Sequence, residues 1–85
     1  MLSRSVDEII EAVVNWLSAA EIQETYAAPG SRRDELRGFI DRATRFLDAL
    51  GQNELLIRGG VGSASSKIEE EFQALAEWAK RLSLR

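Results

Sequence analysis

The chain has 85 residues, of which 45% are hydrophobic and 29% charged, with a formal net charge of −3 and neither cysteine nor histidine. This length and composition are typical of one small folded domain, so we treat residues 1–85 as a single domain. The missing cysteine excludes disulfides and thiolate metal sites, and the missing histidine removes the commonest general base and transition-metal ligand. We therefore expect no enzymatic activity, no cofactor, no metal and no small-molecule substrate.

The sequence also carries no sign of a membrane segment. No run approaches the roughly 18 apolar residues of a membrane span. The first ten residues, MLSRSVDEII, lack the continuous apolar core of a signal peptide. We expect a cytoplasmic protein.

A first helix is predicted to begin after Ser5. Ser5 and Glu8 form a capping box, in which each side chain satisfies a backbone amide at the helix end. An apolar stripe at helical spacing then follows, made of Val6, Ile9, Ile10, Val13, Trp16, Leu17 and Ala20.

The pattern changes beyond Ala20, and two interpretations compete. A continuous helix would place Glu24 on the buried side and leave Ile22 and Tyr26 as an exposed apolar pair beside Ala19. A bend or restart near Ser18, where a second capping box begins, would turn both side chains into the core. No glycine or proline forces a break, so we favour the continuous helix.

Pro29 and Gly30 end this first segment, because proline cannot continue the helical hydrogen bonding and glycine supplies a turn. A second helix is predicted from Ser31, which we expect to cap it, to a left-handed terminator at Gly51. Its apolar stripe is the cleanest in the chain, made of Leu36, Phe39, Ile40, Ala43, Phe46, Leu47 and Leu50. A short loop makes the first two helices antiparallel.

The stretch after Leu50 is less regular. Residues 55–58, LLIR, fit either one helical turn capped by Asn53 or a short extended piece, with at least two of their apolar side chains covering the end of the bundle. We expect Gly59 to Ser65 to be a mobile connector. A third capping box at Ser66 then predicts a last helix, whose stripe is Ile68, Phe72, Leu75, Trp78, Ala79 and Leu82.

Candidate sites for chemistry are weak. The segment GGVGSASSK resembles a phosphate-binding loop only in its glycines, because no glycine immediately precedes Lys67 as the P-loop motif requires. Glu24 and Glu71 are the carboxylates closest to apolar faces, and paired buried carboxylates can act as acid and base. Without a histidine, cysteine or metal cluster beside them, we interpret both as helix-edge residues that reach water or an arginine such as Arg33 or Arg58.

Charge is distributed unevenly along the chain. Residues 5–28 carry five acidic side chains and no basic one, whereas residues 31–50 carry five arginines and four acids. An acidic helix lying beside an arginine-bearing one explains this, and so does an acidic surface that faces a basic partner. The acidic neighbours of the arginines and the acidic chain as a whole argue against nucleic-acid binding.

The sequence predicts an all-α, up-down-up three-helix bundle, with a Gly/Ser-rich irregular crossover between the second and third helices. Function is predicted largely by elimination: a non-enzymatic protein–protein interaction module that binds another protein or itself, as a homo-oligomer, through an apolar helix face. The predicted contact residues are Ala19, Glu21, Ile22 and Tyr26, with Glu21 at the rim. The alternative is a small acidic inhibitor that occupies a basic surface of an enzyme or nucleic-acid-binding complex, and a weaker one is a nucleic-acid-binding helical domain.

Overall fold

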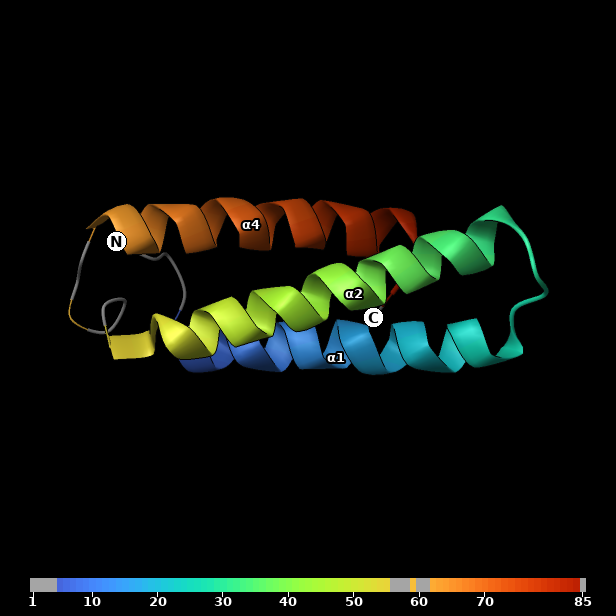
Figure 1. The fold of residues 1–85 in the computed structure, drawn as a ribbon, viewed down its shortest axis with the longest axis horizontal. Helices are drawn as coiled ribbons and strands as arrows, with labels where there is room; N and C mark the ends of the chain where they lie inside the picture. Colours follow the sequence, from blue (N-terminus) through green and yellow to red (C-terminus); the bar gives the residue numbers. More distant parts are fainter. Residues whose placement is uncertain (1–4, 56–58, 60–61, 85) are drawn as a thin grey trace.

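The protein is an all-α bundle of three antiparallel helices, as the sequence predicts. The computed structural model describes residues 5–55, 59 and 62–84, with only the backbone of residues 62–65. Helix α1 spans Val6–Tyr26, α2 spans Ser31–Gln52 and α4 spans Gly62–Arg81. The chain runs up, down and up along an elongated body of 44 × 20 × 17 Å, with α2 crossing obliquely between α1 and α4 (Figure 1). α1 packs more extensively on α2 than on α4.

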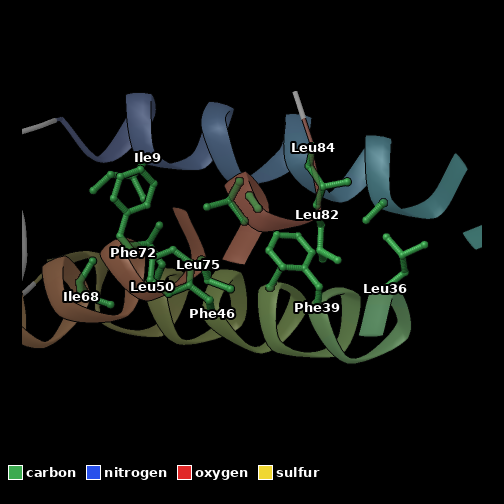
Figure 2. Close-up of a cluster of buried hydrophobic side chains, with 14 of the residues drawn as sticks. Ile9, Leu36, Phe39, Phe46, Leu50, Ile68, Phe72, Leu75, Leu82 and Leu84 are labelled. Atoms are coloured by element: carbon green, nitrogen blue, oxygen red, sulfur yellow. The ribbon is translucent and has the colours of Figure 1, made fainter. Parts of the chain in front are cut away.

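The core consists of one apolar stripe from each helix. The five fully buried positions of α2 are those of its predicted stripe, Leu36, Phe39, Ala43, Phe46 and Leu50. Figure 2 shows their larger side chains pointing into the space between the helices, against residues of α1 and α4. Ile40 and Leu47 lie at the edge of this stripe and are partly buried. The periodicity of α2 therefore locates the core correctly.

Phe72 joins all three helices. Its ring, on α4, stacks on Trp16 of α1 with ring centroids 5.4 Å apart and lies 6.5 Å from Phe46 of α2. Aromatic pairs at these separations add to the stability that burial alone provides. The contact is important for α1 and α4 in particular, because these two helices share the smallest interface of the bundle.

A second aromatic contact fixes α4 on α2. The indole of Trp78 packs edge-to-face on Phe39 at 5.5 Å and lies over Gly38, where an added Cβ would come 3.4 Å from the ring. Its Nε1 donates a hydrogen bond of 3.2 Å to the Glu35 carboxylate. The absence of a side chain at Gly38 therefore lets the indole approach the α2 backbone closely.

Arg32 ties the opposite end of the bundle together. Its Nη2 donates to the side-chain oxygen of Gln23 on α1 at 2.6 Å and to the backbone carbonyl of Leu82, just past α4, at 3.0 Å. The last carbonyls of a helix lack intrahelical partners and carry partial negative charge, so a guanidinium is a favourable donor there. One side chain of α2 thus links all three helices.

The ends of α2 differ from the sequence prediction. Ser31 is the first helical residue and not the cap. The cap is Gly30, which has a φ of 155° that favours glycine, so the start of α2 has no side-chain capping hydrogen bond. Gly51 does not end the helix, because the helix continues to Gln52. Asn53 closes it, and both its backbone N–H and its side-chain amide donate to the carbonyl of Ala49.

The start of α4 also differs. The helix begins at Gly62, so Ser66 lies inside it and is not its cap. Alanine and serine cost a helix little, which lets the helix extend through residues that we expected in a mobile connector. The irregular crossover is therefore shorter than predicted. Gly60 lies outside the described residues, so the predicted mobility of the connector stays a prediction.

The short segment at residues 55–58 lies mostly outside the described residues. Glu54 and Leu55 are helical, and the amide of Gly59 donates to the carbonyl of Leu55 at 2.9 Å. Leu55 is 87% exposed, so it does not cover the end of the bundle. The choice between one helical turn and an extended piece concerns residues 56–58, which are not described.

α4 ends in a turn that no glycine or proline in the sequence predicts. Ser83 adopts a left-handed φ of 60°, while its amide donates to Lys80 and the amide of Leu84 donates to Ala79. This is the hydrogen-bond pattern of a Schellman motif, with serine where glycine is usual. The turn directs Leu84 back toward α1, where it is only 5% exposed and extends the core (Figure 2).

Removal of the Phe46 ring should test the core. We expect Phe46→Ala to lower the free energy of unfolding by about 3–5 kcal/mol, because the side chain is buried and its loss leaves a cavity. Chemical denaturation followed by circular dichroism measures this. The exposed neighbour Arg45 is the control, and Arg45→Ala should change stability by about 0.5 kcal/mol or less. Equal effects of the two changes would contradict this core.

Two glycines should respond in opposite directions to alanine. Gly51 is helical and has open space at the Cβ position, so Gly51→Ala should stabilise the protein by about 0.5–1 kcal/mol. Gly30 has a φ that alanine rarely adopts, so Gly30→Ala should destabilise it by about 1–3 kcal/mol. Thermal melting of both variants checks the pair. A loss of stability in Gly51→Ala would contradict the helical conformation of Gly51 and favour the predicted left-handed helix end at this residue.

Candidate functional site

Helix α1 is continuous through the region where a bend was the alternative. Ser5 caps its first turn, with its Oγ accepting a hydrogen bond of 3.1 Å from the amide of Glu8. The helix passes through Ser18 without interruption. Its last turn is closed by the hydroxyl of Thr25, which donates to the carbonyl of Glu21, and by the amide of Ala27, which donates to Glu24. The preferred interpretation of the sequence is therefore confirmed.

Because α1 is one continuous helix, six of its exposed side chains lie in one line along its axis. At about 100° per residue, these positions fall within roughly 80° around the helix axis. We call them the outer stripe of α1: Glu8, Glu11, Asn15, Ser18, Ile22 and Tyr26. Its C-terminal half carries two large side chains of apolar character, Ile22 at 61% exposure and Tyr26 at 85%.

The four predicted contact residues do not all share this surface. Ile22 and Tyr26 lie on it one turn apart, and Ala19 lies at its edge, partly buried against the core. Glu21 is exposed, but it sits about 100° from Ile22 and about 140° from Tyr26 around the helix. Glu21 therefore belongs to the opposite flank of α1 rather than to the rim of the Ile22–Tyr26 pair.

That opposite flank holds two more exposed apolar side chains. Ile10 is 36% exposed and Val14 is 43% exposed, so the placement of Ile10 in the core stripe was wrong. The physical reason is that only two helices cover α1, and they leave one shoulder of its wide apolar face open. Ile10 and Val14 lie one turn apart in the sequence, but this spacing alone does not distinguish them from the buried stripe, because Val6, one turn before Ile10, is buried.

The carboxylate of Glu24 is a structural group. It lies 3.7 Å from Arg33 Nε and 3.6 Å from Arg37 Nη1, with 18% of its side chain exposed. This agrees with the interpretation that it reaches an arginine. Such bridges hold the C-terminal part of α1 against α2, although partly exposed pairs of this kind add about 1 kcal/mol or less.

Glu71 lies elsewhere in the bundle, on α4, and the structure does not bring it together with Glu24. It is partly buried beside a small hollow lined by Ala49, Asn53, Lys67 and Ile68. In the described part of the chain, no group of three or more acidic side chains is arranged to hold a metal ion. The two carboxylates therefore form no shared site.

Three other acidic side chains of α1 are left to solvent. Glu8, Glu11 and Glu21 are exposed, and within the described residues none of them takes part in an ion pair. The solvent face of α2 differs, since Arg37, Asp41, Arg45 and Asp48 alternate in sign along it. The surface of α1 is thus acidic and apolar, without a basic residue between Ser5 and Ala28.

Comparison with known proteins gives no match: no family model, no curated protein and no solved structure matches the chain. Among the described residues, no helix has the length and apolar character needed to cross a membrane. The exposed surface of α1 is therefore the feature from which a function can be argued.

The outer stripe should be dispensable for folding. We expect Ile22→Ser with Tyr26→Ser to change the free energy of unfolding by about 1 kcal/mol or less, because both side chains are exposed. Ile9→Ser, on the buried side of the same helix, should destabilise the protein by several times as much. Urea denaturation of the variants measures the difference. Comparable losses would place Ile22 and Tyr26 in the core.

Proposed function

We propose that the chain is a non-enzymatic protein-interaction module that binds through the outer stripe of α1. The observation that carries the proposal is the exposure of Tyr26 and Ile22, at 85% and 61%, one turn apart on a continuous helix. Adjacent exposed apolar side chains on a small protein often mark a contact surface. Tyrosine is also enriched among the residues that contribute most to binding.

The support for this surface is its rigidity as well as its exposure. The inner side of α1 is held by Ile9 and Val13 in the core, by Trp16 on Phe72, and by the contact from Gln23 to Arg32. A side chain on a fixed helix loses less conformational freedom on binding than one on a loop. Ile22 and Tyr26 are therefore placed to bind without a large ordering cost.

The experiment compares association of the wild type and the double variant Ile22→Ser, Tyr26→Ser. Mass measurement in solution detects self-association, and quantitative affinity capture from the native lysate detects a foreign partner. We expect the double variant to lose the dimer or the captured partner protein that the wild type shows. The reason is that each side chain should contribute more than about 1 kcal/mol to the free energy of binding. Leu55→Ser, which removes another exposed apolar side chain, is the control and should retain it.

The proposal fails if the double variant associates as the wild type does. Loss of binding in Leu55→Ser, with binding intact in the double variant, would move the contact to the crossover. Both outcomes depend on a folded variant, which the melting curve of each protein establishes first.

A further inference from the structure

The outer stripe has two chemically different halves. Glu8 and Glu11 occupy its N-terminal half, and Ile22 and Tyr26 its C-terminal half, with Asn15 between them. The stripe runs about 27 Å along the helix axis, at 1.5 Å per residue. Any protein that covers its full length must therefore meet carboxylates at one end and an apolar pair at the other.

The helix dipole accounts for only part of this acidity. Asp7 and Glu8 stand in the first turn of α1, where negative charge is favourable. The effect fades within that turn, so it does not explain Glu11, nor the lack of any basic residue up to Ala28. Opposite charges three or four residues apart support one another on the solvated face of α2, and α1 has no such pair between Ser5 and Ala28.

We propose that the outer stripe docks a basic amphipathic helix of another protein. This inference rests on the proposed function and specifies the partner. Apolar side chains of that helix pack on Ile22 and Tyr26, and its lysines or arginines face Glu8 and Glu11. The two helices run antiparallel, because their dipoles then oppose one another. Complementary charge at one end fixes the register and direction of the docked helix.

A second copy of the chain fits this surface less well. Two outer stripes in parallel would place carboxylates against carboxylates, and antiparallel stripes in full register would place Ile22 and Tyr26 against Glu11 and Glu8. Among the described residues, the solvent face of α2 alternates in charge and offers no large apolar side chain. The exposed face of α4 mixes Glu70, Gln73, Glu77 and Arg81. The described surfaces of α2 and α4 therefore lack the combination of apolar and basic side chains.

The test uses two synthetic helical peptides and the full chain. The basic probe carries two leucines one turn apart and, three turns further along the same face, two lysines; the acidic probe carries glutamates in place of the lysines. Fluorescence anisotropy at low salt measures binding of each. We expect the basic probe to bind more tightly, and its affinity to fall as salt is raised.

Two pairs of changes then locate the site. Glu8→Gln with Glu11→Gln should weaken the basic probe roughly threefold to thirtyfold, as expected for two exposed ion pairs. Glu70→Gln with Glu77→Gln removes the same charge from α4 and should leave binding unchanged. Ile22→Ser with Tyr26→Ser should weaken the probe by roughly thirtyfold or more.

The outcomes separate this inference from the proposed function. Equal binding of both probes, or a dimer of the wild type that depends on Ile22 and Tyr26, would overturn the basic partner while keeping the apolar pair as a contact. If the charge variants of α1 and α4 weakened binding of the basic probe equally, net charge would explain the effect. That result would also overturn the proposed basic partner. Binding of neither probe, with association unchanged in the Ile22, Tyr26 variant, would overturn both.

Discussion

The contact of Phe72 with Trp16 and Phe46 is the interaction on which the arrangement of the bundle depends. The ring of Phe72 is the point where one side chain of each helix meets, at centroid distances of 5.4 Å and 6.5 Å. α1 and α4 share the smallest interface of the bundle, and the stack of Phe72 on Trp16 is a direct contact between them. At the other end, Arg32 links the same three helices through hydrogen bonds. The bundle is thus held at two levels along its length.

This arrangement determines which side of α1 remains open. With Trp16 directed at α4, and Glu24 held between Arg33 and Arg37 of α2, the rotation of α1 about its own axis is fixed. The outer stripe then faces away from both neighbours. The contacts that pack the inner side of α1 into the core therefore also determine that Ile22 and Tyr26 are exposed. A function that uses this surface requires no conformational change in the bundle.

The sequence predicts the buried stripes well and the helix ends poorly. A stripe such as Phe39, Phe46 and Leu50 is a repeated signal, and each member supports the others. A cap depends on one residue, and several capping patterns compete. Ser31 and Ser66 both match a cap but lie inside helices, and Gly51 matches a terminator but continues one. The left-handed turn at Ser83 has no glycine that would predict it from the sequence. The burial of Leu84 follows from this turn and was therefore not predicted either.

The candidate site was predictable where it follows from the phase of α1. A continuous helix places Ile22 and Tyr26 outside, and the structure confirms this exposure. The exposure of Ile10 and Val14 was not predictable, because it depends on the directions from which α2 and α4 approach. The position of Glu21 around the helix axis can be calculated from the step of about 100° per residue. The prediction placed it at the rim only because it precedes Ile22 in the sequence. Partner binding by any of these residues stays a prediction.

The central claim is that α1 is one continuous helix with a buried side and an outer stripe on which Ile22 and Tyr26 are exposed. Solvent paramagnetic relaxation, measured by NMR with a soluble gadolinium complex in dilute protein, tests it most directly. The account predicts strong broadening of the Ile22 methyl and Tyr26 ring signals, with the Ile9 methyl and Phe72 ring signals spared. Equal protection of Ile22, Tyr26 and Ile9 in the dilute monomer would contradict it.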